Sequence, residues 1–114
     1  MKLVHLRTGA VLANHVERAA TVKSRLLGLL GREALPEGEA LLLEPCTSIH
    51  TFFMRFPIDV AFVGADGRVL KLYESLKPWR ATWLHRTAAL AIELPAGTCE
   101  RTGTRDGDRL ELRA

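Results

Sequence analysis

The segment from residue 46 to residue 59 brings together an unusual variety of side chains that could bind a ligand or take part in a reaction. It combines a thiol, an imidazole, a thioether, a guanidinium and a carboxylate with three phenylalanines. Core strands rarely need such varied polar groups, and surface loops rarely carry so many aromatic rings. The segment is therefore the first candidate for a functional site.

Cys46 and His50 stand in a C-x3-H spacing that suggests two kinds of chemistry. A zinc site needs about four ligands, and the other soft ligands are scattered along the chain, at Cys99, His5, His15 and His85. A nucleophilic pair needs the imidazole within hydrogen-bond reach of the thiol, together with an oxyanion hole. The favoured interpretation is a buried thiol beside a histidine bonded to backbone, so no metal and no cofactor is predicted.

Asp59 lies between Ile58 and Val60 in an expected strand over residues 58–63. A buried carboxylate must be hydrogen-bonded, paired or protonated. We expect either an ion pair with Arg55 or hydrogen bonds from nearby backbone amides. The alternative is a small enzyme, with or without a metal ion, that uses Cys46 or His50 while Asp59 orients the reacting group.

A second unusual segment begins at Lys77 and contains Trp79, Arg80 and Trp83 without a sustained period. The tryptophans either cap the core or form an aromatic lip that grips a partner, because Trp and Arg dominate binding hot spots. We expect this segment to meet the first one around a shallow, solvent-open pocket. The predicted ligand-binding residues are His50, Thr51, Met54, Arg55, Asp59, Trp79 and Arg80.

Such a pocket predicts a non-catalytic binding module for a small anionic molecule or a protein segment. Arginine supplies charge-assisted hydrogen bonds, aromatic rings exclude water, and His50 adds pH sensitivity. If the first segment is extended, Phe52, Met54 and Phe56 share one face, whereas Phe53 and Arg55 share the other.

Hydrophobic periodicity predicts short strands separated by frequent turns. The expected strands cover residues 2–6, 10–16, 39–43, 58–63, 68–76, 88–94 and 109–112, with a hairpin turn at Asp66-Gly67. An amphipathic helix is expected over residues 22–30, with Thr21 as its cap, and a single helical turn capped by Thr98 is expected later. These elements predict a mainly β fold, an antiparallel β-sandwich or partly open barrel with one amphipathic helix packed on it.

Length and composition are those of one ordinary globular domain, residues 1–114. The chain is 47% hydrophobic and 25% charged, with a net charge of +3 and scattered basic residues. Nucleic-acid binding is not predicted, because such proteins concentrate basic charge on one face. No signal peptide and no membrane span are visible. We expect a cytoplasmic protein with reduced thiols, either a monomer or a weak dimer.

Several sequence blocks, in order along the chain, match a known family. The blocks are RLLGLLGR (25–32), LPEGEALL (35–42), FMRFPIDVAF (53–62), DGRV (66–69), ELPAGT (93–98) and GDRL (107–110). The chain thus resembles the DUF192 (UPF0127) family, whose members have no established biochemical function. The resemblance implies a jelly-roll-like sandwich with a helix on the sheet, and its subgroup suggests an accessory role in a secretion or pilus-type assembly. Many relatives carry a Trp-x-Met-Lys-Asn-type stretch where this chain reads FFMRF, so a ligand shared across the family is not carried over.

Overall fold

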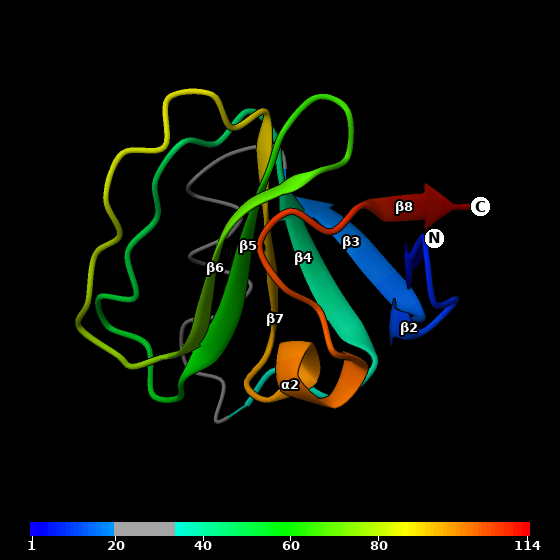
Figure 1. Cartoon of the computed structure of the whole chain (residues 1–114). Helices are drawn as coiled ribbons and strands as arrows, with labels where there is room; N and C mark the ends of the chain where they lie inside the picture. The colour runs from blue at the N-terminus through cyan, green and yellow to red at the C-terminus, as the bar shows by residue number, and fades with distance from the viewer. Residues whose placement is uncertain (20–33) are drawn as a thin grey trace.

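A computed structural model describes residues 1–19 and 34–114 and shows a mainly β fold built from two sheets and one short helix (Figure 1). The elements are β1 (Lys2–His5), β2 (Val11–Ala13), β3 (His15–Ala19), β4 (Glu39–Leu43), β5 (Ile58–Val63), β6 (Val69–Leu76), β7 (Leu90–Pro95), α2 (Thr98–Thr102) and β8 (Leu110–Arg113). No closed barrel forms among these strands, so the sandwich-like alternative is confirmed.

The strands form a three-stranded sheet in the order β2-β1-β8 and a five-stranded sheet in the order β3-β4-β7-β5-β6. All pairs are antiparallel except β3 with β4, which are parallel. The larger sheet is therefore mixed and not purely antiparallel. A parallel neighbour requires a crossover of a dozen or more residues, and residues 20–38 connect these two strands.

The three central strands of the five-stranded sheet, β4, β7 and β5, are buried on both faces. In the fully buried β5, Ala61 and Val63 join the cluster of apolar side chains that faces the smaller sheet. Ile58, Val60 and Phe62 join a second cluster on the opposite face. Because side chains alternate along a strand, this near-continuous apolar sequence supplies both clusters, as expected for a strand with no solvent-facing side.

Most strands lie where the hydrophobic pattern predicts them, and β4 and β5 have the predicted bounds. The expected strand over residues 10–16 is different, because Asn14 divides it into β2 and β3, which belong to different sheets. The amides of Asn14 and His15 both donate to the carbonyl of Gly38, at 2.8 and 3.0 Å. The predicted helix over residues 22–30 lies outside the described residues.

The turn between β5 and β6 confirms the hairpin predicted at Asp66-Gly67. The amide of Gly67 donates to the carbonyl of Gly64 at 3.0 Å, and Gly67 has a φ of 85°. A Cβ atom at Gly67 would lie 2.8 Å from the carbonyl oxygen of Leu110. Glycine is thus required both by the backbone conformation and by the close approach of the turn to β8.

Asp59 is fully buried and joins β5 to two other parts of the fold. Its Oδ1 accepts the amide of Ser75 at 2.8 Å, and its Oδ2 accepts the amide of Cys99 at 2.9 Å. The backbone-amide alternative for this carboxylate is therefore the one the structure shows. The prediction that Thr98 caps α2 is wrong, because the Thr98 hydroxyl donates to the carbonyl of Pro95. The amide of Cys99, in the first turn of α2, donates to Asp59 instead.

We expect Asp59→Asn to lower the free energy of unfolding by about 1–3 kcal/mol, because one buried amide would then face an NH2 group. Urea denaturation measures this difference. Glu111→Gln is the matched control, since Glu111 forms only an exposed ion pair with Arg113, and its effect should stay below about 1 kcal/mol. Equal stability of the two variants would contradict the structural role of Asp59.

Candidate functional site

The two unusual segments of the sequence lie side by side on the face of the five-stranded sheet opposite the smaller sheet (Figure 1). His50 and Ala81 form an isolated antiparallel bridge. The amide of Thr82 donates to the carbonyl of Ile49 at 2.9 Å, and the amide of His85 donates to the carbonyl of Thr47 at 2.8 Å. The predicted meeting of the regions around residues 50 and 79 is present in the structure, whereas the shallow pocket expected between them stays a prediction.

Thr51 is the residue that joins the two segments most extensively. Its amide donates to the carbonyl of Arg80 at 2.8 Å, and its carbonyl accepts the amide of Trp79 at 3.0 Å. Its hydroxyl donates to the carbonyl of Lys77 at 2.6 Å and accepts the amide of Arg80 at 3.0 Å. Because irregular backbone must satisfy its buried polar groups, this fully buried threonine fixes the relative position of both loops.

His85 anchors the second loop to the sheet beneath it. Its Nε2 forms a 2.7 Å hydrogen bond with the hydroxyl of Tyr73 on β6. The imidazole also packs against Phe62 of β5, with ring centroids 4.6 Å apart. His85 therefore acts in the packing of the loop, a role that its isolated position in the sequence did not reveal.

Four rings from the two loops form a continuous aromatic surface, consisting of His50, Phe52, Phe53 and Trp79. His50 stacks on Phe52 with centroids 4.7 Å apart, and Phe52 stacks on Trp79 at 6.0 Å. Phe53 contacts the other side of this group, 4.7 Å from Trp79. Phe53 and Trp79 are 65% and 56% exposed, so the rings contact one another and also face solvent.

The two most exposed rings of this surface stand on strained backbone. Phe53 has a φ of 68° and Trp79 a φ of 63°. The left-handed region costs a residue with a Cβ about 1–2 kcal/mol, and such residues concentrate at functional sites. The strain is retained at two aromatic residues that lie in contact with each other and with solvent.

The predicted site residues take different positions relative to the aromatic surface. His50 and Trp79 belong to it, and Arg55 and Arg80 are exposed on the same two loops. Thr51 and Met54 are buried beneath it. The expected alternation of side chains along residues 52–56 is wrong, because the chain turns at Phe52 and Phe53 and exposes both rings. Met54 and Phe56 face the core. Any ligand contact by these residues stays a prediction.

Phe52 and Phe53 were not among the predicted ligand-binding residues. The signal available in the sequence was their adjacency in a five-residue stretch, FFMRF, that holds three phenylalanines without a strand or helix period. Asp59 was predicted there, but the pleat directs it to the opposite face of the sheet, where it bonds Cys99. The structure therefore separates Asp59 from His50 and Trp79.

Cys46 and His50 each bond to nearby backbone. The thiol of Cys46 donates to the carbonyl of Ser48 at 3.2 Å, and Nδ1 of His50 accepts the amide of Phe52 at 3.3 Å. Within residues 1–19 and 34–114, no three His, Cys, Asp or Glu side chains are grouped so that they could hold a metal ion. No helix in the same part of the chain is long and apolar enough to cross a membrane.

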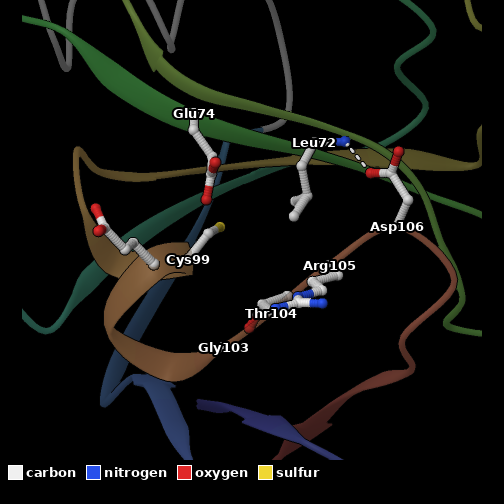
Figure 2. Close-up of a pocket in the computed structure, with 8 residues that line it drawn as sticks. Leu72, Glu74, Cys99, Gly103, Thr104, Arg105 and Asp106 are labelled. Carbon is white, nitrogen blue, oxygen red and sulfur yellow. Dashed lines mark hydrogen bonds between the residues drawn. The ribbon is translucent and has the colours of Figure 1, made fainter.

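A cavity of about 440 Å³ lies on the other side of the sheet, between β6 and α2 (Figure 2). Its lining residues are Leu72, Glu74, Cys99, Glu100, Gly103, Thr104, Arg105 and Asp106. Burial raises the pKa of the Cys99 thiol, and the negative charge of Asp59 raises it further. A thiol is nucleophilic only as the thiolate, so Cys99 stays protonated and unreactive at neutral pH.

Comparison with known proteins identifies the family. The family model described as "Uncharacterized ACR, COG1430" matches residues 4–112. The chain belongs to the DUF192 family. A UPF0127 protein of Pyrococcus furiosus is 32% identical over 114 residues, covering 96% of each chain. A UPF0127 protein of Thermococcus sibiricus is 29% identical over 96% of this chain and 73% of its own length.

Two solved structures resemble this DUF192 chain. One, a proposed transcription regulator from Sinorhizobium meliloti, has a TM-score of 0.78 and 27% identity, covering 96% of this chain and 89% of its own. The other, a protein of unknown function from Novosphingobium aromaticivorans, has a TM-score of 0.74 and 22% identity, covering 98% and 93%. The second similarity shows that the fold is shared.

We expect Thr51→Val to lower the free energy of unfolding by about 1–3 kcal/mol, because the carbonyl of Lys77 and the amide of Arg80 lose their hydroxyl partner. Chemical denaturation measures the change. Thr87→Val on the exposed part of the second loop is the control, with an expected change within about 0.5 kcal/mol. A Thr51 variant as stable as this control would show that the hydroxyl does not hold the loops together.

Iodoacetamide at neutral pH should label the partly exposed Cys46 and leave the buried Cys99 unmodified until the protein is denatured. Intact-mass spectrometry gives the number and order of labelled thiols, and Cys46→Ser should abolish labelling of the native protein. Native labelling at Cys99 would contradict its raised pKa and its burial.

Proposed function

We propose that this DUF192 domain is a non-catalytic binding module that holds a protein segment on its aromatic surface. The segment we infer is one with apolar side chains and carboxylates. The observation that carries the proposal is the pair of Phe53 and Trp79, two exposed aromatic residues in contact and both on left-handed backbone. Neither the exposure of the rings nor the backbone strain stabilises the isolated fold. A partner that covers the rings would bury apolar area that the strained backbone holds at the surface.

The charge of the two loops favours a carboxylate-bearing partner. The loops at residues 44–57 and 77–89 contain four basic residues, all exposed, and one acidic residue, Glu44, which pairs with Arg18 of β3. The basic residues are Arg55, Lys77, Arg80 and Arg86. The rest of the chain has twelve of the sixteen Lys and Arg residues against twelve of the thirteen Asp and Glu residues. The net positive charge of the protein is therefore concentrated on the loops that carry the aromatic surface.

The shape of the surface favours a protein segment over a small anion. Phe52, Phe53 and Trp79 present their rings side by side, and Trp83 and Leu84 extend the exposed apolar area along the same loop. Large aromatic side chains with arginine nearby are typical of binding hot spots. A small anion needs the guanidinium groups but leaves the rings in water. In an accessory role within a larger assembly, the same surface would serve as the contact.

A second candidate is a small enzyme that uses Cys46 or His50. The closeness of the two residues in sequence and the partial exposure of Cys46 favour it. The rate of the native labelling reaction distinguishes the two functions. As part of a binding module, Cys46 should react with iodoacetamide no faster than a free thiol, whereas an activated nucleophile would react faster because its pKa is depressed.

Selection from a random peptide library displayed on phage tests the proposed function. Peptides enriched on the immobilised protein should combine Asp or Glu with Trp, Phe or Leu. Arg55→Ala and Arg80→Ala should each weaken their binding about tenfold, because each removes charge-assisted hydrogen bonds. Lys2→Ala on β1 is the matched control and should leave the affinity unchanged.

Trp79→Gly gives a sharper test, because glycine adopts the positive φ without strain. Relief of strain should offset much of the lost ring contact, so the free energy of unfolding should change by no more than about 1 kcal/mol, while peptide binding is lost. Failure to enrich any peptide, or equal binding by the Trp79 variant, would contradict the proposal. Duplex DNA is the comparison probe, since one structural relative is named a proposed transcription regulator, and DNA that displaced the peptides would also count against it.

A further inference from the structure

A cavity of about 400 Å³ lies where the β5–β6 turn meets the chain that leads into β8. The residues that line it are His5, Leu6, Arg7, Arg68, Gly107, Asp108 and Arg109. In Figure 1 the β5–β6 turn lies beside β8, while the loops of the aromatic surface are at the opposite side of the molecule. The cavity is therefore independent of the proposed protein-binding surface.

The backbone places two of these arginines directly opposite each other. Arg68 and Arg109 are partners in an antiparallel bridge. The amide of Leu110 donates to the carbonyl of Gly67 at 2.9 Å, and this close approach is possible because Gly67 has no Cβ atom. Opposed residues of an antiparallel pair have their Cβ atoms about 5 Å apart, and like charges in that position are destabilising.

Only one carboxylate lies between the two guanidinium groups. Asp66 Oδ2 is 3.9 Å from Nε of Arg68 and 3.8 Å from Nη2 of Arg109. Both distances are too long for hydrogen bonds, and each arginine side chain is about half exposed (50% and 49%). Exposed ion pairs of this kind contribute little to stability, so the N–H groups remain accessible to a stronger acceptor.

Asp108, the carboxylate that lines the cavity, is bonded to a buried histidine. His5 is 1% exposed, its Nδ1 accepts the amide of Thr8, and its Nε2 lies 2.8 Å from Asp108 Oδ2. The same oxygen accepts the amide of Arg105 at 2.9 Å. The hydrogen bond with His5 holds the pKa of Asp108 below its usual range, and the positive charge of Arg7 contributes to the same shift. Three arginines thus lie near two carboxylates. Both carboxylates already accept hydrogen bonds, Asp66 from the amide of Arg68 and Asp108 from His5 and the amide of Arg105.

We propose that this cavity binds a small organic phosphate through the guanidinium groups of Arg68 and Arg109, with Arg7 as a third cationic contact. Arginine forms paired hydrogen bonds with phosphate oxygens in a fixed planar geometry. A bound phosphate would also remove the repulsion between the two opposed arginines. The cavity volume lies in the range of small-molecule sites and exceeds what a phosphate group alone would fill.

Isothermal titration calorimetry at low ionic strength, with adenosine monophosphate and inorganic pyrophosphate as probes, tests the proposal. Both probes should bind the full-length protein, and Arg68→Gln and Arg109→Gln should each weaken binding about tenfold. Arg113→Gln on β8 is the matched control, because that side chain is equally exposed but contacts only Glu111, and its affinity should equal that of the wild type. Far-UV circular dichroism and thermal melting of each variant establish that it is folded.

Further outcomes also decide the proposal. Tighter binding of adenosine monophosphate than of pyrophosphate would support an organic phosphate as the natural ligand. Equal weakening by the Arg113 and Arg109 variants would reveal a general attraction of anions and overturn the site. Citrate bound as tightly as either phosphate probe would overturn the assignment to phosphate. A result with no heat of binding for any probe, confirmed by an unchanged melting temperature, would overturn the whole inference.

Discussion

The burial of the central strands of the five-stranded sheet on both faces is the constraint on which the rest of this structure depends. β5 has no solvent-facing side, since Ala61 and Val63 pack toward the smaller sheet and Val60 and Phe62 pack away from it. The smaller sheet covers one face, and the second face is covered in part by two irregular segments. Irregular chain has no ladder of its own, so those segments must bond to each other. The inner side of the two loops therefore covers the sheet, and their outer side faces solvent, where it is accessible to a partner.

This arrangement explains how a small domain holds strained aromatic residues in place. Thr51 fixes the backbone of Trp79 and Arg80 from below, and His85 anchors the same loop to Tyr73 and Phe62. The inner side of the two loops packs against the core. This packing holds residues on the outer side in strained conformations, which an unsupported loop would not keep. The left-handed backbone at Phe53 and Trp79 depends on this support.

On the opposite side of the molecule, the smaller sheet likewise holds irregular chain in place. The close contact between Gly67 and Leu110 brings the β5–β6 turn against the chain entering β8, and it places Arg68 opposite Arg109. Asp59, on the same face of the larger sheet, fixes α2 through the amide of Cys99. Asp59 thus helps to position α2, and Gly67 helps to position the chain that enters β8.

Local patterns in the sequence determined most of the strands and the hairpin, because strand periodicity and the Asp-Gly turn are set by neighbouring residues. The apolar runs of β4 and β5 and the turn at Gly67 are therefore visible in the sequence alone. Several sequence blocks in order along the chain indicated the family. The meeting of residues 50 and 79 was predicted from their unusual composition. Only the tertiary structure decided that Asp59 faces α2, that Met54 and Thr51 lie under the surface, and that Phe52 and Phe53 lie on it. Those outcomes depend on long-range hydrogen bonds and on a turn at Phe53, whose positive φ no sequence rule assigns to phenylalanine.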